Sequence, residues 1–193
     1  MADIIWQRTF SRVVEEHGIP DDWSLFQDAE LNKEEGWLCY DQTTFGSFRC
    51  SNCRRFWHSA EISIMFLLQQ NRWNRSGRVR MRIFRQQCSQ CEYPIMETPN
   101  IQIKNVERVV RNLANKICRT YYGAPTGTED LKSIANVKAD GPHDKENCEA
   151  CQGGICEEKG FGSAGVIVGA VAVAAALGIG ALFAFSQEKK QKK

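Results

Sequence analysis

Histidine is scarce in this sequence, and the familiar catalytic patterns are missing. The chain has three histidines among 193 residues, no glycine-rich phosphate-binding loop, and no nucleophile paired by its spacing with a general base. Zinc deaminases need His-x-Glu ahead of Pro-Cys-x-x-Cys, whereas His58 is followed by Ser59-Ala60 and no proline directly precedes a Cys-x2-Cys pair. We therefore expect a protein that is not an enzyme.

Excess charge and a secretory signal are also missing. The formal net charge is only +2, so any basic surface must be local. The first residues, Met-Ala-Asp-Ile-Ile-Trp-Gln-Arg, lack a basic region followed by an apolar run and a small-residue cleavage site. We therefore expect the cysteines to lie in a reducing compartment, where metal binding is favoured over disulfides.

Cysteine, in contrast, is abundant and regularly spaced. Six of the nine cysteines form Cys-x2-Cys pairs, namely Cys50/Cys53, Cys88/Cys91 and Cys148/Cys151. Each pair delivers two sulfurs from one tight turn, and zinc takes four such ligands in a tetrahedron. The third pair stands in the series His143-x4-Cys148-x2-Cys151-x4-Cys156, which offers four ligands of its own. Cys39 and Cys118 stand apart, and we expect them to be small core residues.

Hydrophobic periodicity predicts an α+β fold. Helical spacing indicates helices at 3–17 and 101–122, with Gly123 as the cap of the second. Alternating apolar residues indicate short strands at 37–40 and 45–48 and a β-hairpin of 58–70 and 78–87 that turns near Asn74. Residues 21–36 are expected to be irregular, with Trp23 and Phe26 as anchors. The predicted fold is a small zinc-stabilised antiparallel β domain with flanking helices, followed by one transmembrane helix.

The predicted hairpin explains why two of the cysteine pairs would meet. Its turn places position 57 opposite 91 and position 60 opposite 88. Both pairs then arrive at one end of the hairpin, as in a zinc ribbon. We expect two structural zinc ions, and whether the sites use the pairs in sequence or exchange them stays open. The expected ligands of the two ions are Cys50, Cys53, Cys88 and Cys91, and His143, Cys148, Cys151 and Cys156.

A long uncharged run predicts a membrane span. Residues 164–185 contain only Ala, Val, Gly, Ile, Leu and Phe, and as a helix they extend about 33 Å, enough for a hydrocarbon core of about 30 Å. A buried core helix would keep a polar face, which this run lacks. Gly165 and Gly169 lie one turn apart, a spacing that favours packing against a client helix or a second copy of the chain.

The segments around this run complete the expected organisation. Residues 1–35 pack on a zinc domain at 36–156, a stalk follows at 157–163, and a basic tail occupies 186–193. The positive-inside tendency would keep this tail in the cytosol. Reduced zinc ligands, however, require the domain itself to be cytosolic. We resolve the conflict in favour of a cytosolic domain and a translocated tail.

Several motifs together resemble the receptor-transporting protein family. They are the three Cys-x2-Cys pairs, Phe45-Gly-Ser-Phe-Arg-Cys-Ser-Asn-Cys53, Trp57-His-Ser-Ala60, Gly77-Arg-Val-Arg-Met-Arg-Ile-Phe84 and Gly141-Pro-His-Asp-x3-Cys-Glu-Ala-Cys151. The resemblance covers roughly residues 5–156 and implies a 3CxxC zinc domain with a C-terminal transmembrane segment. It also implies an accessory role, because members bind G-protein-coupled receptors, notably odorant and bitter-taste receptors, and promote their folding and surface delivery. One branch of the family is linked to antiviral defence.

The resemblance and the predicted span together imply a location. We expect a single-pass protein of the endoplasmic reticulum or plasma membrane, with its zinc domain in the cytosol. The chain departs from longer family members in its short stalk, 157–163, which puts in question any role that needs a flexible tether.

Arginine is concentrated in the predicted hairpin. Arg78, Arg80 and Arg82 share one strand face, opposite Val79, Met81 and Ile83. Three interpretations are open for this face: ordinary solvation, contact with anionic lipid headgroups or an acidic receptor loop, and binding of RNA. The leading functional hypothesis is a membrane-anchored receptor chaperone. The alternative is a zinc-dependent RNA-binding effector of innate immunity.

Overall fold

The computed structural model describes residues 2–124 and 143–155. The chain divides into two units, 1–157 and 158–193, so every described residue belongs to the first. Within the described residues no helix combines the length and apolar character needed to cross a bilayer. The predicted span at 164–185, with Gly165 and Gly169, lies outside the described residues, as does the tail at 186–193.

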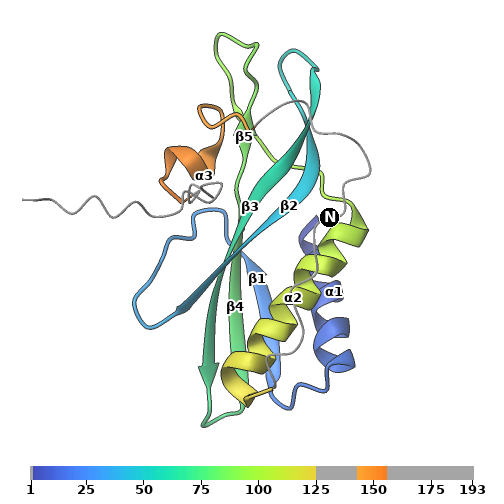
Figure 1. The fold of residues 1–193 in the computed structure, drawn as a ribbon, viewed down its shortest axis with the longest axis vertical. Coiled ribbons are helices and arrows are strands. Elements are labelled where there is room, and N and C mark those ends of the chain that lie inside the picture. Colours follow the sequence, from blue (N-terminus) through green and yellow to red (C-terminus); the bar gives the residue numbers. More distant parts are fainter. Residues whose placement is uncertain (1, 125–142, 156–193) are drawn as a thin grey trace, which may run out of the picture. The chain divides into compact units, whose positions relative to one another are not determined.

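The described chain forms two long helices, a four-stranded sheet and three short elements (Figure 1). The elements in order are α1 (Ala2–Glu16), β1 (Asp22–Gln27), β2 (Leu38–Arg49), β3 (Phe56–Asn71), β4 (Ser76–Ile83), β5 (Gln86–Gln87), β6 (Met96–Glu97), α2 (Ile103–Tyr122) and α3 (Glu149–Gln152). Both predicted helices are confirmed to within two residues at each end. Gly123 caps α2 in the left-handed region, with φ 66°, and its N–H donates to the Cys118 carbonyl.

The sheet has the strand order β1-β4-β3-β2, and its β2–β3 and β3–β4 pairs are antiparallel. The predicted hairpin is therefore confirmed, but its register differs by one residue, because Ile64 rather than Met65 faces Ile83. The two predicted short strands before Cys50 are one strand, β2. A β-bulge between Thr44 and Gly46 shifts the register of its pairing with β3, and the strand continues beyond the bulge.

The first strand, β1, was not expected, because its flanking acidic residues suggested irregular chain. Strand β1 pairs in parallel with β4. Trp23 and Leu25, two residues apart, both point into the core, and each is 4% exposed. Trp23 packs directly over Gly77, where an added Cβ would lie 2.1 Å from the indole ring. The prediction of Trp23 as an anchor is confirmed. The same prediction for Phe26 is wrong, because Phe26 occupies the outward position of the strand and is 50% exposed.

Helices α1 and α2 cover one face of the sheet (Figure 1). The apolar stripe of α2 and that of α1 meet the inward side chains of β1, β3 and β4 in one core, which includes Phe10, Phe66, Met81 and Leu113. The contact of α2 with β2 is partly polar. Gln42 donates to the Val109 carbonyl at 2.9 Å and accepts from Asn112 at 3.2 Å.

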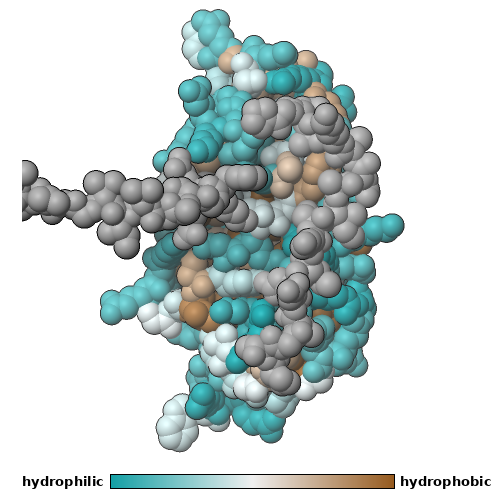
Figure 2. All heavy atoms as spheres, viewed as in Figure 1, coloured by the Kyte–Doolittle hydropathy of each residue, from teal (hydrophilic) through white to brown (hydrophobic). Residues whose placement is uncertain are grey.

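The opposite face of the sheet is covered by irregular chain and α3. Met65 and Leu67 of β3 pack there with Leu31, Phe84 and Ala150, so the middle of β3 is buried on both faces. This explains why residues 64–68 form a continuous apolar run rather than an alternating one. The face shown in Figure 2 is mostly hydrophilic, with apolar side chains in small separate patches.

Candidate metal centre

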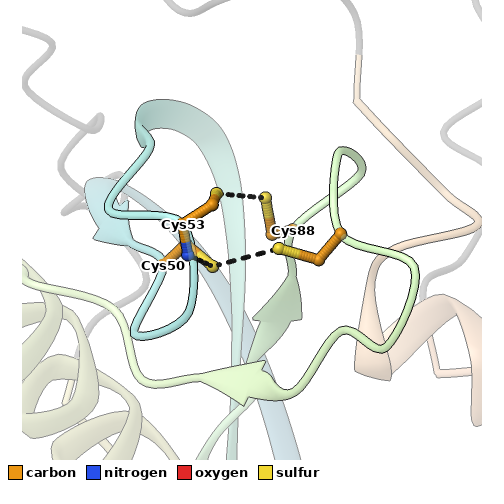
Figure 3. Close-up of side chains that lie close together, drawn as sticks. Cys50, Cys53 and Cys88 are labelled. Atoms are coloured by element: carbon orange, nitrogen blue, oxygen red, sulfur yellow. Dashed lines mark hydrogen bonds between the residues drawn. The ribbon is translucent and has the colours of Figure 1, made fainter.

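Two Cys-x2-Cys turns converge at one end of the β2–β3 pair. Cys50 and Cys53 lie in the turn that joins β2 to β3, where the Cys50 N–H donates to the Arg55 carbonyl and Arg54 adopts a left-handed φ of 65°. Cys88 and Cys91 follow β5. The close-up shows Cys50 and Cys53 pointing across a narrow gap toward Cys88 (Figure 3). The two turns therefore face each other, as the sequence predicted.

The four sulfurs have the spacing of a metal site. All lie within 4.8 Å of one another, with Sγ–Sγ distances of 3.6 Å for Cys50–Cys91 and 3.7 Å for Cys53–Cys88. A tetrahedron with Zn–S bonds of about 2.3 Å has edges of about 3.8 Å, whereas a disulfide bond is about 2.05 Å long. The donor set therefore fits a tetrahedral thiophilic metal and not a pair of disulfides.

The protonation of these thiols also favours a bound cation. The backbone N–H of Cys53 points at the Cys50 sulfur, 3.4 Å away, and lowers the pKa of Cys50 to about 7. Hydrogen bonding to Cys50 and Cys53, together with burial, raises the pKa of Cys91 to about 12. Thiols packed this closely cannot all ionise unless a positive charge lies between them. A divalent cation supplies that charge.

A second cluster contains His143, Cys148 and Cys151, whose ligand atoms also lie within 4.8 Å of one another. The Nε2 of His143 is 3.1 Å from the Cys151 sulfur, and its Nδ1 is 3.6 Å from a Glu61 carboxylate oxygen. Nδ1 makes no hydrogen bond at that distance, so Glu61 is an acidic neighbour and not the hydrogen-bonded partner that a metal-binding histidine usually has. Cys156, the fourth predicted ligand, lies outside the described residues.

The two clusters bear on whether the metal sites use the Cys-x2-Cys pairs in sequence or exchange them. The first contains the first and second Cys-x2-Cys pairs, and the second contains the third pair with His143. The grouping of the described ligand atoms therefore favours use of the pairs in sequence. Cys39 and Cys118 belong to neither cluster, and burial raises the pKa of both thiols.

Glu149, between Cys148 and Cys151, attaches the second cluster to the sheet. Its carboxylate accepts from the Arg85 N–H and from the Arg85 guanidinium, both at 2.7 Å, and from Arg82 at 3.0 Å. Burial alone would raise the pKa of Glu149, but these hydrogen bonds outweigh burial and lower it. Backbone pairing adds to the attachment, because Gln87 donates to the Asn147 carbonyl at 2.9 Å. The cysteine spacing gave no signal for this contact.

The face of β4 that carries Arg78, Arg80 and Arg82 is less available to partners than the sequence suggested. Arg78 is exposed, but Arg80 forms ion pairs with Asp28 and Glu34. Arg82 pairs with Glu149 and donates to the Leu31 carbonyl at 2.9 Å, and its side chain is 12% exposed. Arg80 and Arg82 therefore stabilise the chain internally, and of the three only Arg78 is exposed for a headgroup or partner.

The fold and the cysteine geometry define a zinc-ribbon domain with three Cys-x2-Cys pairs, and the family model of this 3CxxC type, described as a zinc-binding domain, matches residues 43–154. The chain also resembles named proteins. Receptor-transporting protein 4 of Homo sapiens is 37% identical over 78% of this chain and 63% of that protein. Receptor-transporting protein 3 of Mus musculus is 33% identical over 82% of this chain and 34% of that protein. Receptor-transporting protein 1 of Homo sapiens is 32% identical over 80% of this chain and 60% of that protein.

The chain belongs to the receptor-transporting protein family. It carries the family's zinc-binding domain, and the matched part spans less than two thirds of the length of these three relatives. No solved structure matches the chain.

Proposed function

We propose that this chain is a membrane-anchored accessory protein that binds G-protein-coupled receptors of the odorant or taste type and promotes their folding, membrane targeting and cell-surface expression. Membership of the receptor-transporting protein family carries this proposal. The described part of the chain supports it, because its features are those of a binding scaffold: paired thiols, a packed sheet and, on the face shown in Figure 2, a mostly hydrophilic surface.

Two structural zinc ions complete the proposed scaffold. Cys50, Cys53, Cys88 and Cys91 would hold one, and His143, Cys148, Cys151 and Cys156 the other. With four protein ligands, neither ion keeps the open position that a catalytic zinc needs. The role of the metal is then to fasten loops together, since binding of structural zinc contributes directly to the folding free energy.

The proposed location is the membrane of the endoplasmic reticulum or the plasma membrane, with the zinc domain in the cytosol. The apolar run at 164–185 would anchor the chain, and Gly165 and Gly169 would allow it to pack against a client helix or a second copy. The RNA-binding alternative ranks below receptor delivery, because Arg80 and Arg82 are neutralised by carboxylates and the basic face is smaller than its sequence suggested.

Surface delivery of receptors tests this proposal. The full chain, a variant without 164–193 and Cys88→Ser would each be co-expressed with a panel of odorant and taste receptors, and surface receptor would be measured by flow cytometry. We expect the full chain to raise the surface level of at least one receptor and both variants to lose the effect. If no receptor responds while the purified chain retains RNA at physiological salt, the RNA-binding alternative replaces the receptor-delivery proposal.

A further inference from the structure

The turn between β3 and β4 presents a fully exposed tryptophan among arginines. Trp73 is 99% exposed, whereas Trp6, Trp23 and Trp57 are each 8% exposed or less. The segment 71–78 reads Asn-Arg-Trp-Asn-Arg-Ser-Gly-Arg, with three arginines and no acidic residue. A large aromatic side chain left in water beside cations marks a contact surface.

The turn is preformed. The Trp73 N–H donates to the Asn71 side chain at 3.0 Å, and Ser76 donates to Asn74 at 2.7 Å. Arg75 adopts a left-handed φ of 51° and donates to the Pro20 carbonyl and the Asp21 carboxylate. Asp21 in turn accepts from Tyr122 at 2.8 Å. A ligand that meets this turn therefore meets a fixed shape and bears little cost of ordering it.

The charge of the turn is directed outward. Arg75 is engaged by Asp21, whereas Arg72, next to Trp73 in the sequence, and Arg78, on β4, are exposed. The exposed Asp22 of β1 is in register with Ser76, so this end of the sheet is less basic than segment 71–78 alone. The turn is a convex tip at the end of the sheet opposite β5 (Figure 1). A single protruding indole on a segment with two exposed arginines suits a soft anionic surface, since tryptophan favours the headgroup level of bilayers and arginine is attracted to acidic lipids.

We propose that the β3–β4 turn docks on an anionic membrane surface, with Trp73 at the headgroup level and Arg72 and Arg78 beside lipid phosphates. This inference rests on the membrane anchoring contained in the proposed function. It identifies a second point of attachment, in addition to the apolar run at 164–185.

The length of the chain allows both attachments on one bilayer. Ile155 packs on the cluster that contains Met65 and Leu67, and Trp73 lies about 20–26 Å further along the hairpin at about 3.3 Å per residue. Residues 156–163 can extend about 26–29 Å. At full extension, residues 156–163 are therefore long enough for a span that begins at 164 to enter the surface that the turn touches.

Quenching of tryptophan emission by brominated phosphatidylcholine tests the contact. The zinc-loaded full chain would be reconstituted in vesicles of phosphatidylcholine alone and of phosphatidylcholine with phosphatidylserine. The Trp73 signal is the difference between the natural chain and Trp73→Phe. We expect this signal to be quenched, and more strongly with phosphatidylserine. In Arg72→Gln/Arg78→Gln, the ratio of docked to free tips should fall about fivefold for each charge removed.

The matched control is Arg8→Gln/Lys104→Gln, which removes two exposed charges from the helices. It should keep the quenching of the natural chain. The inference is overturned if Trp73 is unquenched in both kinds of vesicle or if phosphatidylserine does not increase its quenching. It is also overturned if the control variant loses as much quenching as the turn variant. Receptor delivery is a separate readout: delivery without Trp73 quenching removes only this inference, and quenching without delivery removes only the receptor role.

Discussion

At the scale of single residues, the neighbours of a thiol decide its chemistry, as Cys88 and Cys118 show. Cys88 is 1% exposed and its sulfur lies 3.7 Å from that of Cys53. Cys118 is half-buried on α2, and burial raises its pKa. The first environment offers several sulfurs to one metal ion, and the second favours a neutral thiol that fills space.

Serine substitutions at these two positions should therefore have different effects. We expect Cys88→Ser to lower the zinc content from about two ions per chain to about one and to lower the thermal midpoint. Cys118→Ser should keep both ions. Zinc would be measured by elemental analysis of the purified full chain, and equal zinc loss in the two variants would contradict the ligand assignment.

At the scale of elements, the Glu149 contact joins the segment 143–155 to β4 and β5. Arg82 and Glu149 are 12% and 13% exposed at their side chains, so removing the carboxylate leaves a guanidinium with little access to water. Breaking a buried ion pair from one side typically costs about 3–5 kcal/mol, and the partial exposure here places the expectation just below that range.

We predict that Glu149→Gln lowers the free energy of unfolding by about 2–3 kcal/mol and releases one zinc at a lower chelator concentration than the natural chain. Glu146→Gln is the matched control, because Glu146 is exposed in the same segment, and it should change stability by less than about 0.5 kcal/mol. Denaturant titration and competition with a zinc-sensitive dye measure the two effects. If both variants behave alike, the attachment of this segment does not depend on Glu149.

Elements with a strong local pattern were predictable from the sequence, and contacts between distant segments were not. The hairpin and α2 follow from periodicity, and the convergence of Cys50, Cys53, Cys88 and Cys91 follows from the hairpin. The parallel pairing of β1 depends on a side chain from β1 fitting over Gly77. The internal roles of Arg80 and Arg82 depend on carboxylates about fifty and sixty-seven residues away, which no local pattern reveals.

One signal in the sequence was informative but was given too little weight. Met65 and Leu67 fill the positions between Ile64, Phe66 and Leu68, so the apolar run is continuous. Such a run indicates a strand covered on both faces. It could have predicted that a further segment packs against the second face of the sheet, where the structure has residues 28–37 and α3.

At the scale of the whole molecule, the described domain has two regions of different origin. The core beneath α1 and α2 is made mainly by apolar packing. The core at the far end contains Cys50 and Cys88 together with Phe48, Trp57 and Ile62. The sulfurs of the second region converge, so we expect this region to depend on the metal.

Zinc removal should affect the two regions unequally. After chelation of the full chain, we expect amide hydrogen exchange to accelerate first at 50–57 and 86–97, while 64–68 and 106–117 remain protected. The reason is that the buried apolar residues of 106–117, together with Ile64, Phe66 and Leu68, belong to the apolar core beneath α1 and α2. Hydrogen exchange followed by mass spectrometry makes the comparison. Uniform loss of protection along the chain would show that the domain is a single metal-dependent unit.

The contact of Trp23 with Gly77 constrains how this sequence can diverge. Because a Cβ at position 77 would lie 2.1 Å from the indole, no larger residue is acceptable there while tryptophan occupies position 23. A descendant that gains a side chain at 77 must first, or at the same time, accept a smaller one at 23. The two positions, 54 apart in the sequence and paired across β1 and β4, are therefore expected to change together among homologues.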